Sequence, residues 1–239
     1  LMPLLSKSLN VAKSNKRSFA ILPISWTTHE QELINKLVIQ RNGLPGPIFG
    51  SLQNSKDFKP IYDQFYHIGN SKELSGELTT LVKELIFTVV KHAKKDSFLV
   101  FVRASFPNKH FDIPRWHQDG DYFGKVTHAK KFVTALRGRG TLFHKANKSF
   151  RKYYNRTRNE SNNYGDNLDY RKLLQKQIGN NYIEVKPNHG ALFTVADPEK
   201  GAFHSEPPQT KRRLFISILP CTQEQMKTRR SNQQKYNKL

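Results

Sequence analysis

The most regular pattern of apolar and polar positions along the chain lies between Leu74 and Val90. Apolar residues recur there at intervals of three, four and seven, which is the spacing of one face of an α-helix. Lysines follow at its end, where they suit the negative end of the helix dipole. Earlier in the chain, Thr27 with Glu30, or Thr28 with Gln31, has the spacing of a capping box. A second helix is therefore expected to begin there and to end near Gly43.

After Asp96 the pattern changes to short segments rich in β-branched and aromatic residues. Gly, Pro, Asn and Asp bound most of these segments, which is typical of strands joined by turns. Helices followed by many short strands predict an α+β fold, with the helices packed on one face of a mainly antiparallel sheet or barrel. The expected strands are Phe98–Arg103, Phe132–Leu136, Thr141–Phe143, Tyr182–Lys186, Ala191–Val195 and Arg213–Leu219.

The length of 239 residues suits a single domain with appendages. Apolar residues make up only 36% of the chain, but 16 Phe, 9 Tyr and 2 Trp are enough to build one core. No apolar stretch approaches the roughly 20 residues of a membrane helix, so no membrane span is expected. We expect a basic N-terminal arm (1–29), one domain (30–222) and a solvated basic tail (223–239). Within the domain, a helical part (30–96) precedes a β core (97–222) that carries a basic insertion (144–180).

Cysteine usage bears on the cellular compartment. Cys221 is the single cysteine, so it forms no internal disulfide, and an intracellular, reducing compartment such as the cytoplasm is expected. Residues 1–29 contain no acidic residue and are rich in serine, a composition compatible with an organelle transit peptide. A basic arm lying on the domain surface is the simpler interpretation. The sequence leaves the oligomeric state open.

The chain carries 40 Lys and Arg against 19 Asp and Glu, a formal charge of +21, and part of this excess is concentrated in His144–Arg158. Because cations follow phosphates and aromatic rings stack on unpaired bases, this segment is typical of a groove for single-stranded nucleic acid or another polyanion. The alternative is an exposed basic helix whose aromatic residues face the core. The next segment, Asn159–Asn167, has loop composition. The candidate polyanion contacts are Lys145, Lys148, Arg151, Lys152, Arg156 and Arg158.

Two His-x-Asp patterns occur, at His110 and at His117. Residues i and i+2 of a strand point to the same face, so the His and the Asp can hold one metal ion. The first pattern lies in a turn-rich segment between two prolines, which favours the second, His117 with Asp119. A metal site needs a further ligand, and His204 is the candidate. We call His117, Asp119 and His204 the triad; Asp121 is an alternative to Asp119, and His189 to His204.

Arg213 begins an expected strand nine residues after His204. A buried arginine on a strand needs an anion, and a carboxylate fits its planar fork best. Metal ligands together with such an arginine indicate a small dicarboxylic co-substrate. Arg212 or Lys211 takes this place if the strand register slips by one residue, because a slip reverses the face.

The ordered set of triad and Arg213 resembles the Fe(II)/2-oxoglutarate-dependent dioxygenases. Trp116–Asp119 (WHQD) is similar to the WHxD form of the phytanoyl-CoA dioxygenase branch, and Ala191–Asp197 leading into His204 is similar to the prolyl-hydroxylase branch. The resemblance covers roughly Phe98–Pro220. It implies a double-stranded β-helix core of cupin, or jelly-roll, type, with Trp116 packed in the core or the pocket wall.

The resemblance also implies an activity. The triad would hold Fe(II), and Arg213 would bind the far carboxylate of 2-oxoglutarate, with Thr141 or Thr134 as an added contact. Oxygen would drive decarboxylation to succinate and CO2, coupled to hydroxylation or demethylation of a substrate. Three functions follow: such an oxygenase acting on a nucleic acid or a nucleic-acid-associated protein, the same chemistry on a small acidic or acyl metabolite, or a non-catalytic nucleic-acid-binding protein on a degenerate cupin scaffold.

Overall fold

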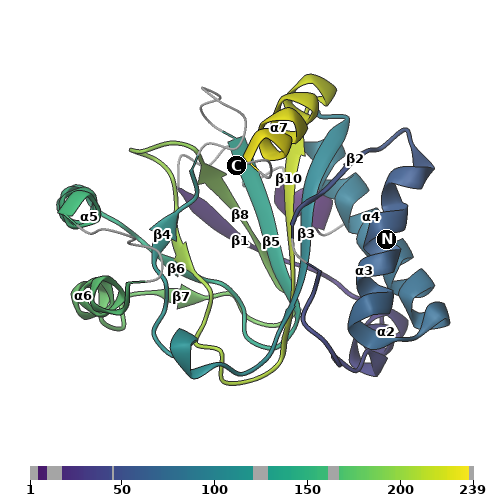
Figure 1. Ribbon diagram of the computed structural model, residues 1–239, viewed down its shortest axis with the longest axis horizontal. Coiled ribbons are helices and arrows are strands. Elements are labelled where there is room, and N and C mark those ends of the chain that lie inside the picture. Colours follow the sequence, from purple (N-terminus) through teal and green to yellow (C-terminus); the bar gives the residue numbers. More distant parts are fainter. Residues whose placement is uncertain (1–4, 10–17, 45, 121–128, 161–166, 237–239) are drawn as a thin grey trace.

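The computed structural model describes residues 5–9, 18–44, 46–120, 129–160 and 167–236 (Figure 1). The helices are α2 (Thr28–Lys36), α3 (Lys59–Gly69), α4 (Lys72–His92), α5 (Lys148–Glu160), α6 (Leu168–Ile178) and α7 (Gln223–Tyr236). The strands are β1 (Phe19–Pro23), β2 (Ile48–Ser51), β3 (Ser97–Ser105), β4 (His117–Gln118), β5 (Ala129–Arg137), β6 (Leu142–His144), β7 (Ile183–Glu184), β8 (His189–Val195), β9 (Phe203–Ser205) and β10 (Arg213–Cys221).

The strands form two antiparallel sheets, one of order β1-β8-β5-β10-β3-β2 and one of order β4-β9-β6-β7. From β3 to β10 the chain crosses between the sheets repeatedly, so that strands distant in sequence become neighbours. This is the topology of a double-stranded β-helix, or jelly roll. The sheets pack together through aromatic residues, with the rings of Phe143 on β6 and Phe193 on β8 centred 5.3 Å apart. The predicted α+β class and β-helix core are confirmed.

Helices α2, α3 and α4 cover one face of the six-stranded sheet (Figure 1). The predicted long helix is α4, which Ser71 caps and whose buried residues include Leu78, Leu81 and Leu85. The capping box at the start of α2 is also present, because Thr27 and Glu30 each accept a backbone hydrogen bond from the other. None of the described helices is long and apolar enough to cross a membrane.

Helix α2 ends at Lys36, well before the predicted end near Gly43. Leu37 is extended (ψ 112°), and its carbonyl accepts a hydrogen bond from the Arg137 guanidinium on β5. Leu37 and Ile39 are buried. Tertiary contacts therefore end the helix at a point where the sequence pattern still permits it to continue.

Both terminal segments differ from the sequence-based expectation within their described parts. The N-terminal segment contributes β1, which pairs with β8 over five residues from Phe19 to Pro23 and so belongs to the sheet. The C-terminal segment forms α7, capped by reciprocal hydrogen bonds between Thr222 and Gln225. Met226 of α7 is buried, and Arg230 donates to the Phe49 carbonyl of β2, so the cap and these contacts hold a polar segment as a helix on the domain.

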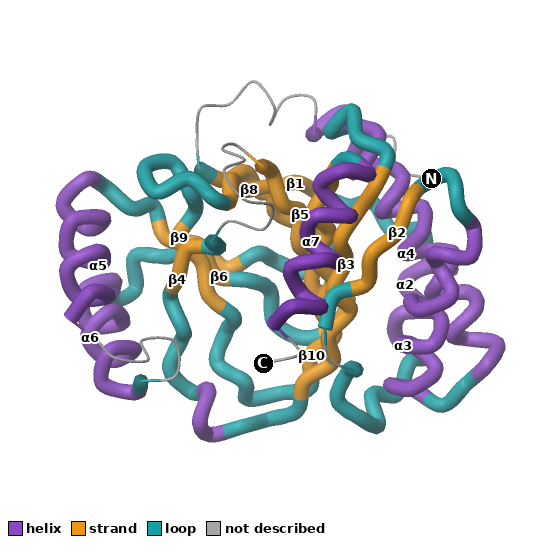
Figure 2. Tube along the Cα trace, turned by 45° about the horizontal axis from the view of Figure 1, so that its top comes forward, coloured by secondary structure: helices purple, strands orange, loops and turns teal. Residues whose placement is uncertain are grey.

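The basic insertion forms α5 and α6, which lie beside the four-stranded sheet and away from α2–α4 (Figure 2). Phe150 and Tyr154 are buried against Phe203 of β9, with ring centroids 5.0 and 4.6 Å from it. The expectation that these aromatic residues stack on bases is therefore wrong for both, and the core-facing alternative holds. Of the predicted loop Asn159–Asn167, the first two residues end α5, and 161–166 lie outside the described residues.

Candidate active site

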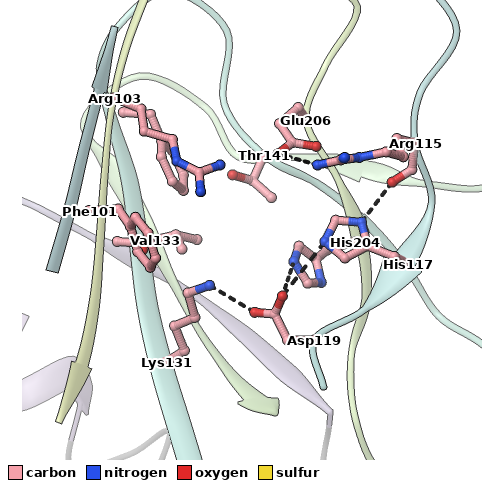
Figure 3. Close-up of a pocket in the computed structure, with 12 residues that line it drawn as sticks. Phe101, Arg103, Arg115, His117, Asp119, Lys131, Val133, Thr141, His204 and Glu206 are labelled. Atoms are coloured by element: carbon pink, nitrogen blue, oxygen red, sulfur yellow. Dashed lines mark hydrogen bonds and ion pairs between the residues drawn. The ribbon is translucent and has the colours of Figure 1, made fainter. Parts of the chain in front are cut away.

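The structure brings the triad together. His117 on β4 and His204 on β9 are directly paired across the antiparallel ladder, and their ring centroids are 4.3 Å apart. Asp119 follows β4, and its Oδ1 lies 3.6 Å from the Nε2 of each histidine (Figure 3). One ligand atom of each residue lies within 4.8 Å of the others, and no other group of three such side chains does so among the described residues.

Backbone carbonyls orient both imidazole rings. Nδ1 of His117 lies 2.7 Å from the carbonyl oxygen of Arg115, and Nδ1 of His204 lies 3.3 Å from that of Ala202. A carbonyl only accepts, so each Nδ1 carries a hydrogen, and Nε2 of each ring, which faces Asp119, is the atom that can bind an ion once it is unprotonated. Metal-ligating histidines are held in this way.

The charge states of the triad also suit a cation. Burial between aromatic rings, together with repulsion from His117, lowers the pKa of His204 to about 4, so this ring is neutral at neutral pH. Burial disfavours the Asp119 carboxylate, but Lys131 and the two histidines outweigh it and hold the pKa of Asp119 well below its ordinary value. For His117, burial is outweighed by the hydrogen bond to Asp119 and the carboxylate charges of Glu206 and Asp119, and the pKa is raised.

The triad lies at one wall of a cavity of about 170 Å³ between the two sheets. Side chains from strands of the six-stranded sheet line its other wall, and Lys131 of that wall forms an ion pair with Asp119 across the cavity. The lining residues are Phe101, Arg103, Arg115, His117, Asp119, Lys131, Val133, Thr141, His204, Glu206, Phe215 and Ser217. This combination of a metal-ligand set and several cations is suited to anionic ligands.

Arg213 and Thr141 also meet. The Arg213 side chain is buried, and its Nη2 donates to the Thr141 hydroxyl at 3.3 Å while its Nε donates to the Arg139 carbonyl at 2.9 Å. Burial lowers the pKa of Arg213 to about 10, so it remains charged at neutral pH. The alternatives Arg212 and Lys211 are exposed, whereas Arg213 is buried.

Arg213 is not among the residues that line the cavity, although Thr141, which it contacts, is. The other candidates do not line the cavity either. Thr134 points to the opposite face of β5, where its hydroxyl donates to the His189 carbonyl. His189 lies at the start of β8, outside the ligand cluster. His110 and Asp112 are exposed near a short 3-10 helix, whereas Asp121 lies outside the described residues.

Four charged residues of the cavity were not predicted: Arg103, Arg115, Lys131 and Glu206. Arg103 extends from β3 into the cavity (Figure 3). The alternation of strand residues places it on the face of Phe101, and Lys131 on the face of Val133. Lys131 was missed because the predicted strand began at Phe132, one residue too late for that pattern to include it.

Glu206 and Arg115 connect the two segments that carry the triad histidines. Each of them lies two residues from one of those histidines in sequence. Their side chains form an ion pair at 3.5 Å. Burial would raise the pKa of Glu206, but His117 and Arg115 outweigh it and lower the pKa to about 2. Glu206 is therefore a carboxylate at the cavity wall at any physiological pH.

The predicted polyanion contacts fall into two groups. Arg151 is half-buried and donates to the carbonyls of Pro198 and Gly201, a structural role. A second cavity of about 280 Å³ has Arg158 and Tyr154 in its wall together with His117 and Asp119, so the basic helix adjoins the triad. The exposed cations of the set are Lys145, Lys148, Lys152, Arg156 and Arg158.

No protein-family model and no curated protein sequence matches the chain, but solved structures do. A prolyl-4-hydroxylase from Pseudomonas putida is 11% identical, with a TM-score of 0.40 over 93% of this chain and 94% of that chain. The non-heme α-ketoglutarate-dependent carbocyclase SnoK of nogalamycin biosynthesis is 9% identical, with a TM-score of 0.42 over 89% of this chain and 82% of that chain. EvdO2 from Micromonospora carbonacea var. aurantiaca, complexed with 2-oxoglutarate, is 12% identical, with a TM-score of 0.42 over 92% of this chain and 90% of that chain. At this degree of similarity, the function must be argued from the residues of this chain.

Proposed function

We propose that this chain is an Fe(II)- and 2-oxoglutarate-dependent oxygenase, a hydroxylase or demethylase. The observation that carries the proposal is the convergence of two histidine Nε2 atoms and one carboxylate oxygen at the wall of a cavity. Two histidines and a carboxylate that leave other positions open are the ligand set of non-haem Fe(II) oxygenases. The neutral His204, the ionised Asp119 and the carbonyl-oriented rings fit such an ion.

Arg213 and Thr141 are proposed to receive the far carboxylate of 2-oxoglutarate. The hydrogen bond between them and the place of Thr141 in the cavity wall support this assignment. Bound iron, with 2-oxoglutarate and O2, would supply oxidation of a substrate C–H bond coupled to formation of succinate and CO2. The chain itself would orient the ligands, keep the carboxylate ionised and enclose the site between two sheets.

The test is an anaerobic titration of the purified protein with Fe(II) and then 2-oxoglutarate, followed by succinate measurement in air. The expected result is a charge-transfer band and slow succinate release, both lost in His117→Ala and retained in His189→Ala. A protein that binds iron but never 2-oxoglutarate would refute the oxygenase. Convergence of the triad already opposes the non-catalytic alternative, which requires that these side chains stay apart.

A polyanionic substrate, such as a nucleic acid or a nucleic-acid-bound protein, is the proposed substrate class. Its support is the second cavity, in which Arg158 of the basic helix and two triad residues share one wall. The alternative, a small acidic or acyl metabolite, is favoured by the narrow first cavity with its cationic lining. An intracellular, reducing compartment belongs to the same proposal, since Cys221 is a buried free thiol.

Charge reversal separates the two substrate classes. The triple variant Lys148→Glu, Lys152→Glu and Arg156→Glu changes exposed residues of α5. Its control, Lys36→Glu, Lys56→Glu and Lys72→Glu, removes the same charge on the side of α2–α4. For a single-stranded oligonucleotide, the α5 variant is expected to lower the salt slope of binding by about 2, at roughly 0.7 per phosphate contact. Equal slopes in the two variants would contradict the polyanion substrate.

A further inference from the structure

The two carboxylate oxygens of Asp119 have different partners. Oδ1 faces the Nε2 atoms of both histidines at 3.6 Å, whereas Oδ2 lies 2.8 Å from the Lys131 Nζ. The figure shows the lysine approaching from the side opposite the imidazole rings (Figure 3). Only Oδ1 is therefore directed to the place that a shared ion would take.

Lys131 is built into the site and is not a surface charge. Its side chain is 9% exposed, as is that of Asp119, and a lysine so buried needs an anionic partner. It comes from β5 of the six-stranded sheet, whereas the triad histidines lie in the four-stranded sheet. The ion pair thus fixes Asp119 from across the cavity.

The surroundings of Lys131 limit where its ammonium group can go. The Nζ lies 5.9 Å from the ring centre of Phe193, and the same ring lies 4.7 Å from that of His204. One aromatic side chain thus contacts both the lysine and a triad histidine.

We infer that Lys131 is a positioning residue that keeps Asp119 a one-oxygen ligand, an inference that rests on the proposed metal site. A carboxylate with both oxygens free can bind a metal through both of them and occupy a second position. With Oδ2 held by Lys131, three protein atoms bind and about three of six positions stay open. Those open positions are what a chelating co-substrate and O2 require.

The experiment counts the waters on bound Mn(II) by water-proton relaxation, which needs no turnover. The wild-type protein and Lys131→Arg are expected to show about three metal-bound waters. Lys131→Met is expected to show about two, because the freed carboxylate oxygen takes one coordination position. Metal affinity in Lys131→Met is expected to change by about 10-fold or more, as for other outer-shell partners. The matched control is Lys130→Met, since the neighbouring lysine on the opposite face of β5 bonds Thr194.

Equal water counts and affinities in Lys131→Met and Lys130→Met would overturn the inference. If Lys131→Met does not fold, Lys131→Gln is tested with the same criterion, because it keeps a donor without the charge. Failure of the unchanged protein to bind Mn(II) or Fe(II) would instead refute the proposed metal site. A protein that binds iron and forms succinate while Lys131→Met keeps three waters would refute only the positioning role.

Discussion

His117 and His204 lie 87 positions apart in the chain and face each other as paired residues of β4 and β9. Each ring is tied through Nδ1 to the carbonyl of the residue two positions earlier, so both strands present an imidazole in the same way. The ladder therefore sets the spacing of the two nitrogens before any ion arrives.

Removal of one member of this pair is expected to abolish metal binding. His204→Ala should weaken Co(II) or Fe(II) binding by more than about 100-fold, the upper range for outer-shell changes, because a direct ligand is lost. Calorimetric titration of the metal-free protein measures this. His189→Ala, outside the ligand cluster, should bind as the unchanged protein does, and a similar loss there would contradict the assignment.

Metal binding should be coupled to the loss of one proton. In the metal-free protein the pKa of His117 lies above 6.5, whereas that of His204 is about 4 and that of Asp119 is well below 3.8. Only His117 must then deprotonate, so affinity falls about tenfold per pH unit once the pH drops below its pKa.

Competition titrations between about pH 5 and pH 8 follow this dependence. Glu206→Gln removes one of the charges that raise the pKa of His117, and it should shift the curve to lower pH. A two-proton slope near neutral pH would show that His204 is not neutral.

Arg213→Met should weaken 2-oxoglutarate binding by about 10-fold or more, since a hydrogen bond to a charged group contributes about 1.5–3 kcal/mol. Thr141→Val should cost less, about 2- to 12-fold. Titration of the charge-transfer band measures both. Arg212→Met, on an exposed neighbour, is the control. A large effect in Arg103→Met with none in Arg213→Met would show that Arg103, and not Arg213, binds the carboxylate of 2-oxoglutarate.

Trp116 attaches β4 to α6, and its loss should destabilise the fold. The indole is 1% exposed, and its Nε1 donates to Gln175 Oε1 at 2.8 Å. Trp116→Phe should lower the free energy of unfolding by about 1–3 kcal/mol, because the half-buried Oε1 of Gln175 then loses its hydrogen-bond donor. Urea unfolding measures this, with Trp26→Phe as the control.

The double variant Trp116→Phe, Gln175→Leu should recover part of the loss, since neither polar group then remains. If the double variant instead loses as much free energy of unfolding as the two single variants together, the hydrogen bond contributes nothing measurable.

The sequence by itself determined what depends on local order. The apolar period of Leu74–Val90 specified α4, the capping box specified the start of α2, and alternating segments specified most core strands. It also placed Arg213 correctly on the face of Phe215 and Ser217, because strand alternation is a local property.

Only the tertiary structure decided which distant residues meet. Helix α7 is too polar to show an apolar period, the strands β1, β4 and β9 are short, and contacts elsewhere in the fold hold all four. Even a strand prediction that included Lys131 would not have shown its role, which depends on Asp119 next to the opposite sheet. Pairing between sheets depends on crossovers and registers that no window of neighbouring residues encodes, so the ion pair became visible only with the two sheets assembled.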